Sequence, residues 1–136
     1  MIRFLREQAA ITSQYMRAAI YARVSTEDQH CEMQLREMGD QADRNGWEKL
    51  IYADMESTRK RRPQLEQLLK DAKARKFDVV LCWKLDRFGR KVKELLTNIE
   101  ILDLAGVRFV CGVIDTDKRN PASRLTLVIL AAVAEF

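Results

Sequence analysis

Short apolar runs alternate with stretches of helical periodicity along most of this chain, and this alternation limits the folds open to it. Strands are predicted over 18–24, 50–53, 77–83 and 107–114. Helices are predicted over 33–45, from Pro63, over 92–102, and from Ala122 or Ser123 to the end. Repeated strand–helix–strand units build a parallel sheet with helices on its faces. We therefore predict an α/β fold, a single domain with a mainly parallel central sheet flanked by helices.

The length and the net charge of the chain limit the class of protein that it can be, but they do not identify its function. The chain has 136 residues, of which 47% are hydrophobic and 32% charged, enough for one buried core. The net charge of +4 is compatible with a nucleic-acid partner but does not require one. A basic run at 59–62 follows the second predicted strand and is expected to form a loop.

The cysteines and the hydropathy pattern point to a reduced, soluble protein. Cys31, Cys82 and Cys111 are odd in number and form no C-x-x-C pair, so a disulfide framework is not expected. No segment reaches the roughly 20 apolar residues of a membrane span. We expect a cytoplasmic protein without a membrane partner.

Polar residues follow three of the predicted strands. Ser25 follows the first, Asp54 and Ser57 follow the second, and 85–90 follow the third. Ligands of parallel α/β sheets bind at the carboxyl ends of the strands, so these segments are expected to converge. The chain has a single histidine, no G-x-S-x-G turn and no metal-ligand spacing. A nucleophilic Ser25 would therefore depend on arginines and carboxylates, which favours phosphate chemistry.

The segment KLDRFGR (84–90) carries the strongest anion-binding pattern. Arg87 and Arg90 are three residues apart and would share a face of a helical turn. Two guanidinium groups directed at one place suit a phosphate, because each is planar and permanently charged. Asp86 could orient one of these arginines or handle a proton.

Other interpretations of these residues stay open. A serine after a strand is commonly a turn or helix-cap residue, and a charged string is commonly a solvated helix start. A small-ligand α/β domain, nucleotide-binding or flavodoxin-like, is a further alternative. The chain lacks the G-x-G-x-x-G turn and the P-loop that would favour it.

Three motifs taken together resemble one family. YARVSTEDQ (21–29), RPQLEQLL (62–69) and KLDRFGR (84–90), in this order and spacing, resemble the catalytic domain of the serine recombinases, the resolvase and invertase family. The resemblance extends over 17–136 and leaves 1–16 as an N-terminal extension. It implies site-specific DNA recombination by transesterification, through a 5′-phosphoserine intermediate and a free 3′-hydroxyl, without metal, ATP or another cofactor.

The resemblance also implies roles for individual residues. Ser25 would be the nucleophile that attacks a DNA phosphodiester. The other catalytic positions would be Arg23, Asp86, Arg87 and Arg90. The pocket and the substrate phosphate would be contacted by Tyr21, Gln29, Gln34, Asp54, Ser57 and Arg62. Thr58 stands where the family usually has glycine, and that loop is about one residue short.

The resemblance implies a catalytic domain truncated before the end of the long C-terminal helix, with the DNA-binding domain absent. The full-length protein would bind DNA as a homodimer or homotetramer. Independently of the resemblance, the run 125–136 is apolar nearly all round and must be covered by the chain's own sheet or by another subunit, and we favour an oligomer contact. The isolated fragment would be weakly active or inactive. The alternative is a catalytically incompetent truncated module that dimerises with or regulates an intact recombinase. The target site, and the choice among resolvase, invertase, integrase and transposase, are not predicted.

Overall fold

A computed structural model describes residues 16–25, 30–55, 61–89, 91–112, 114–117 and 121–134 of the chain. Strands and helices alternate along these residues as the periodicity predicts. The elements are β1 (Arg17–Val24), α2 (His30–Arg44), β2 (Glu48–Met55), α3 (Pro63–Lys73), β3 (Val79–Cys82), the 3₁₀ turn η1 (Leu85–Arg87), α4 (Val92–Leu104), β4 (Arg108–Cys111), β5 (Ile114–Asp115) and α5 (Pro121–Ala134).

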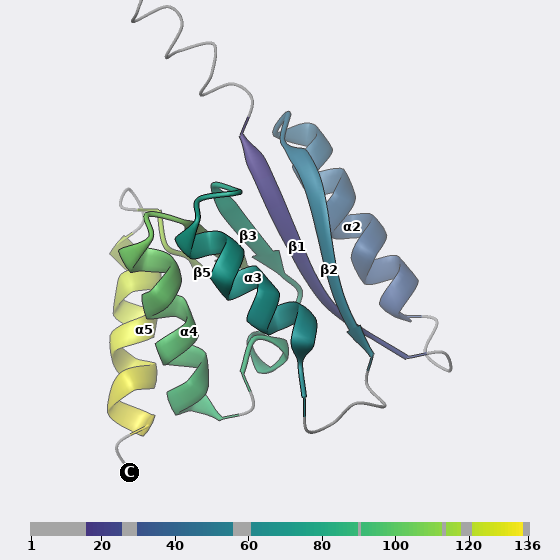
Figure 1. Ribbon diagram of the computed structural model, residues 1–136. Helices are drawn as coiled ribbons and strands as arrows, with labels where there is room; N and C mark the ends of the chain where they lie inside the picture. Colours follow the sequence, from purple (N-terminus) through teal and green to yellow (C-terminus); the bar gives the residue numbers. More distant parts are fainter. Residues whose placement is uncertain are drawn as a thin grey trace, which may run out of the picture.

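The strands form one sheet in the order β2-β1-β3-β4-β5. Strands β1 to β4 pair in parallel, and β5 pairs antiparallel with β4. The long strand β1 is therefore hydrogen-bonded to β2 on one side and β3 on the other (Figure 1). The predicted fold class, an α/β domain with a mainly parallel sheet, is confirmed.

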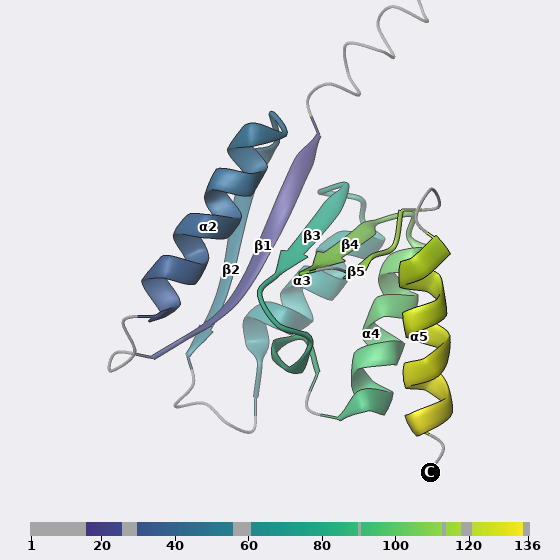
Figure 2. The ribbon, with the colours of Figure 1, turned by 180° about the vertical axis from the view of Figure 1, so that it is seen from behind.

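Helices cover both faces of the sheet. Helix α2 lies against one face, while α3 and α4 lie against the other, with α5 packed outside α4 (Figures 1 and 2). Each face has its own hydrophobic cluster, and β1 and β3 contribute alternate residues to both of them. All four residues of β3 are buried, as expected for a strand covered on both faces.

The structure corrects one predicted strand. The run 107–114 is predicted as a single strand, but it divides into β4 and β5 around Gly112. Gly112 has a φ of +59°, a left-handed conformation that glycine adopts without steric cost. The chain therefore reverses there, and β5 adds an antiparallel edge to the sheet.

Candidate active site

The carboxyl ends of β1, β2 and β3 bring three segments to one edge of the sheet. Ser25 follows β1 directly, Asp54 is the penultimate residue of β2, and η1 follows β3. Helices α3 and α4 both begin at this edge, beside η1 (Figure 1). The convergence expected from parallel pairing is present for the described residues.

Asp54 holds three elements together below this edge. Its side chain is only 2% exposed. Asp54 Oδ2 accepts hydrogen bonds from the Tyr21 hydroxyl at 2.8 Å and from the Leu65 amide at 3.0 Å, and Oδ1 accepts one from the Gln64 amide at 2.8 Å. The first amides of a helix lack partners within the helix, so this carboxylate caps α3. It thereby ties β1 and β2 to the start of that helix.

Tyr21 acts as a hydrogen-bond donor to Asp54. Burial is the main cause that raises the pKa of Tyr21 far above its usual value. The hydrogen bond to Asp54 and the negative charge of Asp54 raise this pKa further. The positive charges of Arg62 and Arg23 lower the pKa and only partly offset the rise. Tyr21 therefore keeps its proton at neutral pH and does not serve as a general base.

Arg62 connects the start of α3 with η1. It is the N-cap residue of α3, is 8% exposed, and donates a hydrogen bond from Nη1 to the Arg87 carbonyl at 3.0 Å. The Nε atoms of Arg23, Arg62 and Arg87 are all buried, and that of Arg23 has no hydrogen-bond acceptor among the described residues. Three guanidinium groups from separate segments therefore bring permanent positive charge to this edge, an arrangement that suits a phosphate.

The η1 segment is anchored in the hydrophobic core by the residue that follows it. The Phe88 ring is fully buried and packs edge-on against Tyr21, with ring centroids 6.1 Å apart, and against Phe109 at 4.8 Å. Asn98 of α4 donates a hydrogen bond from Nδ2 to the Phe88 carbonyl at 2.9 Å. Asn98 is not among the residues predicted from the sequence. The only signal for it there is a polar residue within the apolar face of a helix.

Hydrogen bonds or electrostatic interactions link five of the residues predicted for the site. These are Tyr21, Arg23, Asp54, Arg62 and Arg87. Ser25 directly follows β1 at the same end of the sheet, and Gln34 is half-buried in α2. Gln29, Ser57 and Arg90 lie outside the described residues, as does the side chain of Asp86. Their predicted roles stay predictions.

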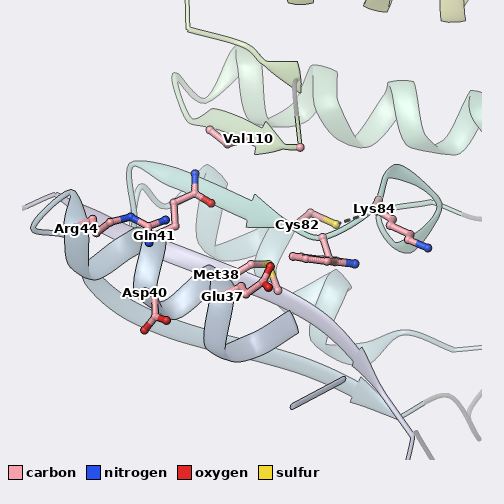
Figure 3. A pocket seen from close by; sticks show the side chains of 10 residues that line it. Glu37, Met38, Asp40, Gln41, Arg44, Cys82, Lys84 and Val110 are labelled. Atoms are coloured by element: carbon pink, nitrogen blue, oxygen red, sulfur yellow. Dashed lines mark hydrogen bonds between the residues drawn. The ribbon is translucent and has the colours of Figure 1, made fainter. Parts of the chain in front are cut away.

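A cavity of about 610 Å³ lies elsewhere, between α2 and the strands β3 and β4 (Figure 3). Its lining is mixed, with charged Glu37, Asp40 and Arg44 on α2 and apolar Val110 on β4. None of the residues predicted for the site lines this cavity. It lies on the α2 face of the sheet, whereas Arg62 and the start of α3 lie on the opposite face, so the cavity is separate from the residues predicted for the site.

Neither a metal centre nor a membrane-spanning helix is found among the described residues. They contain no group of three or more His, Cys, Asp or Glu side chains that could hold a metal ion. None of the helices described is long and apolar enough to cross a membrane.

The chain matches a known family over most of its length. A family model described as "Resolvase, N terminal domain" matches residues 18–136. The Transposon Tn917 resolvase of Enterococcus faecalis is 32% identical over 116 residues, which are 85% of this chain and 60% of that protein. The serine recombinase gin of Escherichia phage Mu is also 32% identical over 116 residues, covering 85% of this chain and 57% of that protein.

Solved structures agree with this match. The N-terminal catalytic domain of TP901-1 integrase has a TM-score of 0.72 at 30% identity, covering 88% of this chain and 95% of that one. A resolvase family site-specific recombinase from Streptococcus pneumoniae has a TM-score of 0.73 at 30% identity, covering 88% and 86% of the two chains. The chain spans less than two thirds of the length of the curated relatives described above.

Proposed function

Because the chain belongs to the resolvase N-terminal domain family of serine recombinases, we propose that it is the catalytic domain of an enzyme that cuts and rejoins DNA at specific sites. The observation that carries the proposal is the position of Ser25, at the end of β1 and two residues after Arg23, on the edge where Arg62 and Arg87 also lie. An oxygen nucleophile on the same edge as several fixed cations is an arrangement that suits phosphoryl transfer.

Ser25 is the proposed nucleophile. Its Oγ gives up its proton and forms a bond to phosphorus. The bond from phosphorus to the 3′-oxygen breaks and that oxygen takes up a proton, leaving a 5′-phosphoserine and a 3′-hydroxyl. The covalent link conserves the energy of the phosphodiester, so the reverse reaction with a different 3′-hydroxyl rejoins the strands. This route needs neither ATP nor a metal ion.

The arginines are proposed to stabilise the negative charge that develops on the non-bridging oxygens. Arg23, Arg62 and Arg87 come from β1, the start of α3 and η1. Hydrogen bonds to charged groups contribute roughly 1.5–3 kcal/mol each, so several of them account for a large part of the barrier reduction. We assign Arg90 and Asp86 to the same cluster by their place in the KLDRFGR motif.

Recognition of DNA and assembly into oligomers are proposed for the whole protein. We place the catalytic domain at 17–136 and assign recognition of the DNA site to a part outside this chain. Helix α5 leaves Leu125, Val128 and Ile129 between 55% and 63% exposed, an apolar surface of the kind that a second subunit covers. A homodimer or homotetramer on DNA would cover it.

The test captures the proposed covalent intermediate and can be run before the DNA site has been identified. The protein in its full natural length is incubated with sheared genomic DNA of its source organism and quenched in SDS. DNA that stays attached to the protein is recovered, and its 5′ ends are sequenced. We expect a defined set of ends with the wild-type protein and none with Ser25→Ala.

Two results would contradict the proposal. An adduct that persists in Ser25→Ala would remove Ser25 from the role of nucleophile. A folded, oligomeric wild-type protein that never forms an adduct would favour the non-catalytic module over the recombinase.

A further inference from the structure

The turn that carries Asp86 and Arg87 is too short to hold itself in place. Element η1 has three residues, and the Phe88 amide closes it with a hydrogen bond to the Leu85 carbonyl. Short 3₁₀ turns have poorer hydrogen-bond geometry than α-helices and contribute little stability alone. The position of Arg87 therefore depends on what binds this turn from outside.

Two side chains bind successive carbonyls at the end of η1. Arg62 Nη1 donates to the Arg87 carbonyl at 3.0 Å, and Asn98 Nδ2 donates to the Phe88 carbonyl at 2.9 Å. Carbonyls at the end of a helical turn have no partner within the turn, so both hydrogen bonds supply what the backbone lacks. Arg62 belongs to the arginine cluster itself. Asn98 does not, and it binds from the neighbouring helix.

Asn98 is fixed by the packing of α4. It is 7% exposed and lies on the face of the helix that buries Leu95, Ile99 and Leu102. The same helix contacts the chain just after η1, because a Cβ added to Gly89 would lie 2.6 Å from the Leu95 backbone nitrogen. Close packing and the amide hydrogen bond together attach the end of η1 to α4.

We propose that Asn98 is a positioning residue for DNA cleavage, which holds the end of η1 so that Arg87 stays directed at the reacting phosphate. The proposal rests on the function proposed above. An apolar residue would suit this buried place on α4 equally well, but it could not bind the Phe88 carbonyl. That carbonyl would then turn towards another donor or water, and the peptide that follows Arg87 would turn with it.

The test compares Asn98→Leu with Leu102→Ala, a change one helical turn away on the same buried face. Adduct formation is timed in single turnover at saturating protein, on a DNA fragment recovered in the capture experiment and well below both melting temperatures. We expect Asn98→Leu to slow adduct formation roughly ten- to a hundred-fold, while affinity for the fragment stays unchanged. Leu102→Ala should lower the melting temperature and leave the rate constant near that of the wild type.

A second variant covers the case in which Asn98→Leu does not fold. Asn98→Ala leaves room for a water molecule that can donate to the Phe88 carbonyl, so we expect this variant to fold. The hydrogen bond from a fixed side chain to that carbonyl is nevertheless lost. We expect slower adduct formation from it as well.

Wild-type rates from a folded Asn98 variant would overturn the positioning role while leaving the proposed function intact. If Leu102→Ala slowed adduct formation as much as the Asn98 variants do, Asn98 would only stabilise the fold and would have no separate positioning role. A wild-type protein without any adduct would reject the proposed function, and the positioning role with it.

Discussion

The Tyr21 hydroxyl and the Asp54 carboxylate form a buried hydrogen bond of 2.8 Å between β1 and β2, directly below the edge that carries Ser25. Asp54 also binds the amides of Gln64 and Leu65, so the same carboxylate fixes the start of α3. Arg62 is the residue before that helix, and its place therefore depends on Asp54. One buried acid supports much of the proposed site without needing to touch DNA.

Asp54→Ala is expected to destabilise the fold strongly. The substitution removes the cap of α3 and leaves the Tyr21 hydroxyl buried without its acceptor. Together these losses lower the free energy of unfolding by about 3 kcal/mol. Urea unfolding followed by circular dichroism measures the change. Asp43→Ala is the matched control, because Asp43 is exposed and pairs with Lys49 at the surface, where the loss in the free energy of unfolding is at most about 1 kcal/mol. If both variants lost the same free energy of unfolding, Asp54 would not be the residue that holds β1, β2 and α3 together.

Gly89→Ala tests the close approach of η1 to α4. The added Cβ would lie 2.7 Å from the Leu95 Cα, and backbone cannot move aside as a flexible side chain can. We expect a loss of about 1–3 kcal/mol in the free energy of unfolding. Gly39→Ala is the control, because its Cβ would meet only the Lys49 side chain at 3.9 Å and alanine favours the helix. A neutral Gly89→Ala would show that the two segments can separate freely.

The sequence predicts the order of the elements and the sheet edge at which the candidate segments converge, because periodicity and parallel pairing are local or topological rules. The cap of α3 could not be predicted in this way. Asp54 lies ten residues before Gln64, and no local motif joins a strand residue to the amides of a later helix. Asn98 was not predicted for a related reason. Its hydrogen-bond acceptor, the Phe88 carbonyl, comes within reach only once α4 packs against η1. The reversal at Gly112 was missed because the apolar run continues through it.

Acid should weaken the fold through Asp115. Two hydrogen bonds from Arg108, one of them 2.8 Å long from Nε, are the main cause that lowers the pKa of Asp115 in the folded protein. This contribution to stability is complete above the pKa of an unfolded aspartate, about 3.9, and is lost as the pH falls through the lower folded-state pKa. Asp115→Asn cannot titrate there.

Urea unfolding at several pH values between about 2.5 and 6 measures this difference. The free energy of unfolding should fall less steeply with acid in Asp115→Asn than in the wild type. Acid sensitivity that is the same in both proteins would assign the loss to other groups, such as Asp71, whose folded-state pKa is also lowered, chiefly by its hydrogen bond from Tyr52.

Arg61 and Arg62 are neighbours in the same basic run, but the structure separates their roles. Arg61 is exposed, whereas Arg62 is buried and binds the Arg87 carbonyl. Arg62→Ala should therefore slow formation of the covalent adduct by roughly a hundred-fold or more, since it removes a fixed cation and releases η1. Arg61→Ala should change mainly the salt dependence of DNA binding, because an exposed arginine contributes diffuse charge.

Arg62→Lys separates the two effects of Arg62. Lysine keeps the positive charge but lacks the planar fork, so it cannot bind the Arg87 carbonyl and a phosphate in the same geometry. We expect adduct formation in Arg62→Lys to stay at least about ten-fold below wild type in the single-turnover assay. Full activity would mean that charge alone suffices at this position. Equal effects of Arg61→Ala and Arg62→Ala would mean that the basic run acts as a diffuse patch, and the specific contact between α3 and η1 would then have no part in cleavage.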